Sequence, residues 1–168
     1  NDVLVPTGYQ ILVEYLYAHP EVGILGPKLI NPENKIVGAG VTSASTYHTV
    51  QGWLQPNGPN VFANIEEVVY VGGSALFMSR EMLDDFYEKD GFYFDPQLDF
   101  YFEDFELAVR AKKLGYKVLY CPLTTLVHHH EASLASCPPG GVGSREWRNE
   151  QHEKGKRYFQ SKYPELSI

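Results

Sequence analysis

Two adjacent carboxylates, Glu103 and Asp104, follow an aromatic run and open a segment with helical periodicity. Acidic residues are common at helix N-termini, because each stabilises the helix dipole by roughly 0.3–1 kcal/mol. The same position keeps a carboxylate ionised, and neighbouring residues point in different directions, so one of them can face a substrate. The pair is therefore either a helix-capping feature or a general base at the mouth of a pocket.

Three consecutive histidines occupy positions 128–130. In an extended segment alternate residues share a face, so His128 and His130 point one way and His129 the other. Imidazole is a ligand for Mn, Zn, Fe and Cu. A single histidine is usually a hydrogen-bonded polar residue, but three in a row favour contact with a metal or a phosphate.

Two further features are weak when taken alone. Asp2 is a single carboxylate beside Asn1, in a part of a chain that commonly frays. Gly72, Gly73 and Ser74 interrupt an apolar, β-type run, where glycine marks a bulge or a close approach of the backbone. The chain has no GxSxG, Walker A or HExxH motif.

Helical and extended segments alternate along the chain, which indicates an α/β fold. We expect helices over residues 7–18, 79–86, 103–114 and 144–162. We expect strands over residues 22–25, 36–37, 68–78 and 116–121, the last closed by Pro122. Residues 42–64, which include Trp53, are rich in Ser, Thr, Gly, Pro and Asn and predict a long surface loop.

The composition fits one globular domain: the chain has 168 residues, 43% of them hydrophobic and 21% charged. The net charge of −7 disfavours binding to nucleic acid or anionic lipid. Two cysteines give neither a disulfide framework nor a zinc CxxC pair, which favours a reducing cytoplasm. The chain opens on Asn1 without a leader or a transmembrane segment, as if cut from a larger protein.

Six motifs in order resemble the second half of an inverting, family 2 glycosyltransferase of the GT-A type, close to non-processive, rhamnosyltransferase-like members. The resemblance runs from residue 1 to about residue 133 and rests on residues 1–8, 22–29, 35–40, 71–80, 91–116 and 122–130. The chain departs from the family at Lys35, which replaces a glycine, and at Glu106, which replaces an aspartate. The Q-x-x-R-W motif of processive members is absent, which favours addition of a single sugar.

The resemblance implies a GT-A fold in which this chain is the C-terminal portion, a mixed sheet flanked by helices, without the N-terminal nucleotide-binding half. Residues 1–134 then form the acceptor side, and residues 135–168 form a flexible Pro/Gly segment with a charged helical tail. The implied activity is transfer of a sugar from a nucleotide-diphospho-sugar to a hydroxyl acceptor, with inversion, in bacterial polysaccharide biosynthesis.

The resemblance also assigns roles to residues. Asp104 becomes the general base, with Glu103 beside it. A divalent cation, Mn²⁺ or Mg²⁺, is expected on Asp2 and on His128, or else His129. Substrate contacts are expected from Gly72, Gly73, Ser74, Trp53, Tyr101 and Phe102, the first three through backbone approach and the aromatic residues by stacking on a sugar.

The expected partners are the nucleotide sugar and a carbohydrate or lipid-linked acceptor, with peripheral membrane contact, a cytoplasmic location and no nucleic acid. The missing half or an oligomer partner is expected to complete the site, so the chain alone is expected to bind nucleotide sugar weakly or not at all. Two other interpretations stay open: a non-catalytic sugar- or metal-binding module of the same fold, and a stand-alone metal-binding α/β domain.

Overall fold

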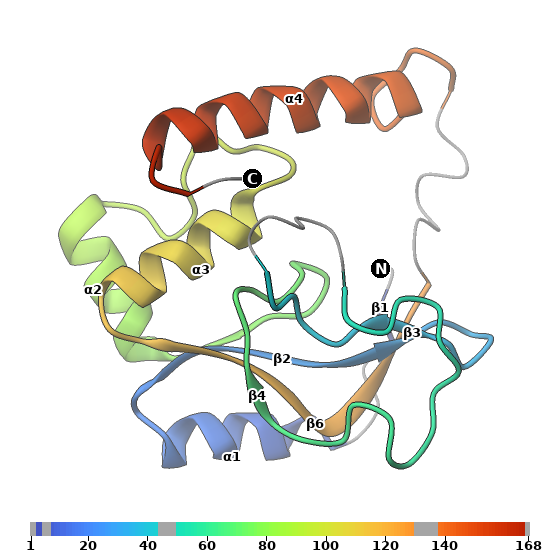
Figure 1. Ribbon diagram of the computed structural model, residues 1–168. Helices are drawn as coiled ribbons and strands as arrows, with labels where there is room; N and C mark the ends of the chain where they lie inside the picture. Colours follow the sequence, from blue (N-terminus) through green and yellow to red (C-terminus); the bar gives the residue numbers. More distant parts are fainter. Residues whose placement is uncertain (1–2, 5–7, 44–49, 130–137, 167–168) are drawn as a thin grey trace.

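The centre of the molecule is a curled mixed sheet flanked by helices (Figure 1), so the α/β class is confirmed. The structure is a computed structural model and describes residues 3–4, 8–43, 50–129 and 138–166. The strands are β1 (Val3–Leu4), β2 (Val22–Ile30), β3 (Ile36–Gly38), β4 (Glu66–Glu67), β5 (Phe77–Met78) and β6 (Lys117–His128). The main order is β1-β6-β2-β3, with β4 also paired to β6 and β5 to β2.

Only the two long strands, β2 and β6, run parallel to each other, and every other pairing in the described sheet is antiparallel. The helices within the described residues are α1 (Gln10–Ala18), α2 (Arg80–Asp90), α3 (Glu103–Lys113) and α4 (Arg145–Lys162). Helix α1 covers one face of the sheet and α3 the other, with α4 stacked beyond α3 (Figure 1).

The period-2 alternation of β6 explains why helices cover both faces. Val118 and Tyr120 belong to the core under α3, whereas Leu119 and Cys121 belong to the cluster under α1. Because the middle of this strand is buried on both faces, its residues 118–123 form a continuous apolar run in the sequence.

Strands β2 and β6 both run through a proline, so the strand ends expected at residue 25 and at Pro122 are wrong. The ladder pairs Gly26 with Tyr120 and next pairs Lys28 with Thr125, so its register shifts in between. Pro27 and Pro122 both fall in this break, where a missing backbone N–H costs no ladder hydrogen bond.

The strand expected over residues 68–78 is also largely wrong. Strand β4 precedes this segment and β5 forms its last two residues, while Gly73 and Ser74 lie in a turn between them. Val68 and Val69 still donate backbone hydrogen bonds to Val118 and Val41. These two hydrogen bonds therefore attach the segment before the glycine-containing turn to the core.

The four expected helices are present, but α2 ends at Asp90 and not at residue 86 as expected. The Ser79 hydroxyl accepts the Met82 N–H at 3.3 Å to begin α2, and Gly91 closes it at a φ of +78°. The Ser144 hydroxyl accepts the Trp147 N–H at 3.2 Å to begin α4. Helix α1 begins later than residue 7, and residues 5–7 lie outside the described part.

Helix α4 packs onto α3 through both apolar and charged contacts. The Phe105 and Phe159 rings stack with centroids 4.6 Å apart. The Lys162 ammonium donates to Asp95 and, at 2.8 Å, to Glu106, a fully buried carboxylate of α3. Helix α4 is thus part of the core. None of the helices in the described part of the chain is both long and apolar enough for a membrane crossing.

Candidate functional site

A pocket of about 800 Å³ lies between one end of the sheet and α4. Its floor comes from β2 and β3, and the end of β6 contributes His128. One wall is the turn at residues 72–74 with the start of α3, and the opposite wall is the first two turns of α4. Elements that are far apart in the sequence therefore meet around one cavity, as is typical of a binding site.

The two carboxylates that open α3 line this pocket. Asp104 Oδ2 accepts the Gly73 N–H at 2.9 Å, and Asp104 Oδ1 accepts the Phe105 N–H at 2.8 Å. Glu103 Oε2 is buried and has no hydrogen-bond partner within the described residues. Two hydrogen bonds therefore orient Asp104, the base expected from the sequence. The buried oxygen of the neighbouring Glu103 has no such bond within the described residues.

Burial raises the pKa of the Asp104 carboxyl to about 7, and the adjacent Glu103 charge adds to this rise. The hydrogen bonds from Gly73 and Phe105 favour the ionised form and oppose it. Burial also raises the pKa of Glu103. A carboxylate that titrates near neutral pH is well matched to general base catalysis, because its proton affinity is close to the working range.

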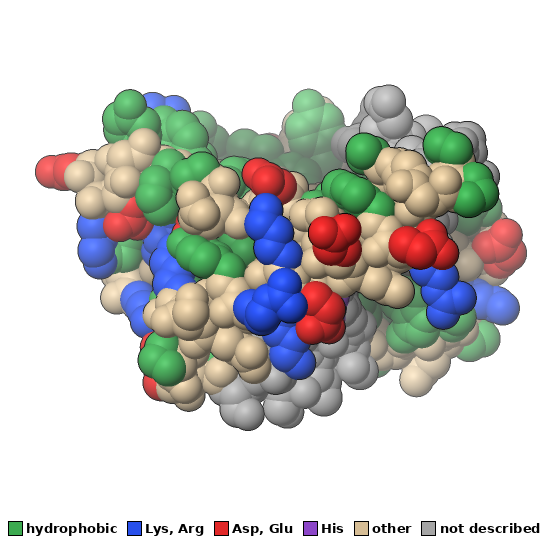
Figure 2. Space-filling view, turned by 90° about the horizontal axis from the view of Figure 1, so that it is seen from above, with side chains coloured by type: hydrophobic (Ala, Val, Ile, Leu, Met, Phe, Trp, Pro, Cys, Tyr) green, Lys and Arg blue, Asp and Glu red, His purple; other side chains and the backbone are tan. Residues whose placement is uncertain are grey.

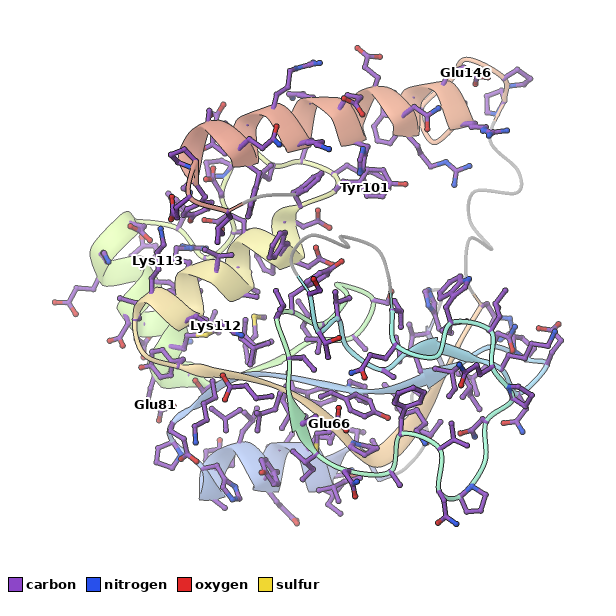
Figure 3. All side chains as sticks on the ribbon, viewed as in Figure 1. Glu66, Glu81, Tyr101, Lys112, Lys113 and Glu146 are labelled. Atoms are coloured by element: carbon purple, nitrogen blue, oxygen red, sulfur yellow. The ribbon has the colours of Figure 1, made fainter. Side chains whose placement is uncertain are left out.

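The backbone just before α3 is strained. Tyr101 and Phe102 have φ values of +67° and +68°, a region that residues with side chains rarely adopt. A Cβ on Gly155 of α4 would lie 3.0 Å from Phe102 Cδ2 and 3.1 Å from the Tyr101 carbonyl oxygen. The close approach of α4 thus holds this pair in place, and Figure 3 shows Tyr101 just beneath α4.

The structure brings most of the expected site residues together. Those that line the pocket are Trp53, Gly72, Gly73, Ser74, Tyr101, Glu103, Asp104 and His128. Phe102 is instead 1% exposed and packs against Phe159, so it offers no ring face to a ligand. The expectation of stacking fails for Phe102 because its ring is buried in the core against α4.

The metal ligands expected from the sequence are only partly in view. Asp2 lies outside the described residues; the residue after it in the chain, Val3, pairs with His128 across the β1–β6 ladder. His128 is 8% exposed, whereas His129 is exposed and does not line the pocket. Within the described residues no group of three or more His, Cys, Asp or Glu side chains is arranged to hold a metal ion.

The pocket wall on α4 was missed by sequence reasoning. Arg148, Asn149 and His152 line the pocket, in a segment expected only to be a charged tail. His152 lies three residues after Asn149 and four after Arg148, separations that place side chains on one side of a helix, and that was the available signal. Tyr70 and Phe100 also line the pocket without having been expected there.

No protein-family model matches this chain. The chain is similar to part of O-antigen biosynthesis protein RfbC from Myxococcus xanthus, with 32% identity over 120 residues. The matched region covers 68% of this chain and 9% of RfbC, so the chain spans less than a tenth of that protein's length.

Proposed function

We propose that this chain is the acceptor-side part of a glycosyltransferase of polysaccharide biosynthesis, with a GT-A fold. The similarity to a stretch of RfbC, whose name places that protein in O-antigen biosynthesis, supports the pathway class. The mixed sheet with helices on both faces is compatible with the fold. The observation that carries the proposal is the Asp104 carboxylate, which lines the pocket and has a pKa of about 7.

The proposed reaction is a single displacement with inversion. The acceptor hydroxyl oxygen attacks the anomeric carbon of the donor sugar as Asp104 takes the hydroxyl proton. A new carbon–oxygen bond forms on the face opposite the breaking bond, and the nucleoside diphosphate leaves with the electron pair. Asp104 is oriented for this step by two backbone N–H groups, so little reorganisation is needed.

We propose Asp2 and His128 as ligands of a divalent cation, Mn²⁺ or Mg²⁺. Such an ion, when bound, neutralises charge on the diphosphate leaving group. The described residues supply only His128 to this set, which by itself is not a metal site. The proton transfer to Asp104 involves only the chain's own residues and not the ion.

Tyr101 and Trp53 are the proposed stacking residues, since both line the pocket. Trp53 is 43% exposed, so its ring can be covered by a ligand. Sugars present apolar C–H faces to aromatic rings, and the remaining polar wall on α4 suits their hydroxyl groups. A carbohydrate or lipid-linked acceptor fits this mixture of surfaces.

The test is release of nucleoside diphosphate from a panel of nucleotide-diphospho-sugars, with Mn²⁺ and Mg²⁺ and with candidate glycan acceptors. Because this chain is proposed to be only the acceptor-side part, we expect turnover by the wild-type sequence within the complete transferase, and its loss in Asp104→Asn. The matched control is Asp99→Asn, a nearby exposed carboxylate that faces Lys154 at 3.7 Å and lies outside the pocket lining. Binding of a nucleotide sugar without turnover would contradict the proposal and favour a non-catalytic binding module.

A further inference from the structure

We propose that Gly73 is a positioning residue for Asp104, and that the absence of a side chain at position 73 keeps the path from the pocket to that carboxylate open. The importance of Asp104 in a reaction rests on the proposed function. The geometry at Gly73 does not, and it can be tested separately.

The first part of the proposal rests on the backbone N–H of Gly73. It donates to Asp104 Oδ2 at 2.9 Å, across 31 residues of chain. The other carboxylate oxygen accepts the Phe105 N–H, which belongs to the same helix as Asp104. Gly73 is therefore the donor that ties the carboxylate to the turn beside α3 on the same wall of the pocket, and it fixes which edge of the carboxylate faces the cavity.

The second part rests on what a side chain at position 73 would meet. An ideal Cβ would lie 3.6 Å from Asp104 Cβ, 3.7 Å from Glu103 Oε1 and 3.8 Å from Asp104 Oδ2. These are ordinary van der Waals distances, so packing does not demand glycine there. The φ of Gly73 is also outside the positive range that demands glycine.

Neither crowding nor backbone conformation therefore explains the glycine. A methyl group at this position would instead stand in front of both carboxylates, inside the pocket that they line. The preceding residue is Gly72, whose ideal Cβ meets no described atom within 4 Å. Two consecutive glycines thus leave open space beside Asp104. A ligand whose hydroxyl group must reach Asp104 Oδ2 fits this space.

The positioning role is tested by an NMR titration of the uniformly labelled chain. We follow the Asp104 side-chain carboxyl carbon and the Gly73 amide proton as the pH is raised through neutrality. Both signals should move with one shared midpoint, and in Asp104→Asn the Gly73 amide should no longer move. A Gly73 amide that ignores the Asp104 titration would overturn this part of the proposal, whether or not the chain transfers sugar.

The open path is tested with Gly73→Ala, which keeps the N–H and fits sterically. The probe is a water-soluble carbodiimide with an amine nucleophile, which reacts with accessible carboxyl groups, and mass spectrometry reads the labelling rate at Asp104. We expect several-fold slower labelling of Asp104 in Gly73→Ala, at an unchanged melting temperature and with the shared NMR midpoint retained.

The matched control is Gly58→Ala, a turn glycine outside the pocket lining whose Cβ would lie 3.4 Å from Val61 Cγ2. It should label Asp104 at the wild-type rate. Equal rates for wild type, Gly73→Ala and Gly58→Ala would overturn the open-path part. Absence of sugar transfer in the wild type and in every variant would reject the proposed function. The NMR midpoint and the labelling rate would still test the role of Gly73.

Discussion

At the scale of single residues, the site combines two carboxylates that differ in their hydrogen bonds. Asp104 accepts two backbone hydrogen bonds, whereas one oxygen of Glu103 is buried without a partner among the described residues. These two backbone hydrogen bonds orient the Asp104 carboxylate, which makes it the better positioned base of the pair. This division could not be seen in the sequence, where the two residues are simply adjacent.

The raised pKa of Asp104 predicts that the base weakens the fold. An aspartate with a pKa of about 7 in the folded state and 3.8 in its ordinary state costs stability once it ionises. The cost is absent below pH 3.8, grows between the two values and is complete above about 7. Asp104→Asn should therefore raise the free energy of unfolding by about 1–2 kcal/mol near pH 8 and by much less near pH 4.

Urea unfolding at the two pH values measures this difference, with Asp99→Asn as the exposed control. Asp99 is open to solvent, so its replacement should change little at either pH. An Asp104→Asn variant that is equally destabilised at both pH values would show that the carboxylate contributes favourable contacts rather than strain.

The two described histidines of the triplet predict different effects on metal binding. His128 is almost buried and lines the pocket, whereas His129 is exposed and does not. In a titration of the chain with Mn²⁺ followed by calorimetry, His128→Ala should weaken binding and His129→Ala should not. The reverse ranking, or binding unaffected by both changes, would remove His128 from the proposed metal site.

At the scale of elements, α4 is fixed to α3 by a buried ionic network. Burial alone would raise the pKa of Asp95, but hydrogen bonds from Lys162, Gln97 and Tyr158 hold it below its ordinary value. Burial alone would lower the pKa of Lys162, but its bonds to Asp95 and Glu106 raise it. Both pKa directions mean that the network stabilises the fold when Asp95 is ionised and Lys162 is protonated.

Lys162→Met should therefore destabilise the chain strongly. It leaves Glu106 and Asp95, with side chains 0% and 3% exposed, without their shared cation. We expect a loss of about 3 kcal/mol at neutral pH, and a smaller loss in acid, where Asp95 is protonated and its contribution disappears. Thermal unfolding of the purified variant measures this loss.

The control for Lys162→Met lies on the same helix. Lys154 faces Asp99 at 3.7 Å, with both side chains more than half exposed. Lys154→Met should cost only about 0.5 kcal/mol, because an exposed pair is screened by solvent. Equal losses in the two variants would mean that the buried network does not hold α4.

Element boundaries were predictable where a local signal sets them and not where pairing does. Ser79 caps the start of α2 through a bond to a residue within one turn, and this signal was read from the sequence, whereas the αL glycine that ends α2, Gly91, was overlooked. Pro122 did not end its strand, because a register shift against β2 removed the need for its N–H. Likewise, Phe102 faces the core although Tyr101 beside it lines the pocket, since two positive φ values redirect the chain.

At the scale of the whole molecule, the pocket exists because α4 returns over the sheet. Residues 72–74, 103–104 and 148–152 come together only in three dimensions, so the sequence indicated the first two groups and missed the third. Figure 2 shows acidic and basic side chains interspersed on the face that carries α4. Ligand recognition is therefore expected to come from the pocket rather than from a surface patch that is all acidic or all basic.

This arrangement predicts that a chain ending at residue 134 cannot keep its fold. Removal of α4 takes away Phe159 and Tyr163, both buried in the main core, and Lys162, which donates to the buried Glu106. The truncated chain should lose its cooperative thermal transition in circular dichroism, whereas the full chain keeps it. A sharp transition near that of the full chain would instead support residues 1–134 as an independent unit.

The most direct test of the proposed chemistry is the pH dependence of kcat/KM for sugar transfer, once the donor panel has given a substrate. Because Asp104 must be ionised to accept the acceptor proton, the rate should fall about tenfold per pH unit below a midpoint near 7, and rise to a plateau above it. Asp104→Asn should abolish this profile together with the activity, while Asp99→Asn keeps both. A rate that is flat through neutral pH, or one that survives in Asp104→Asn, would contradict Asp104 as the general base.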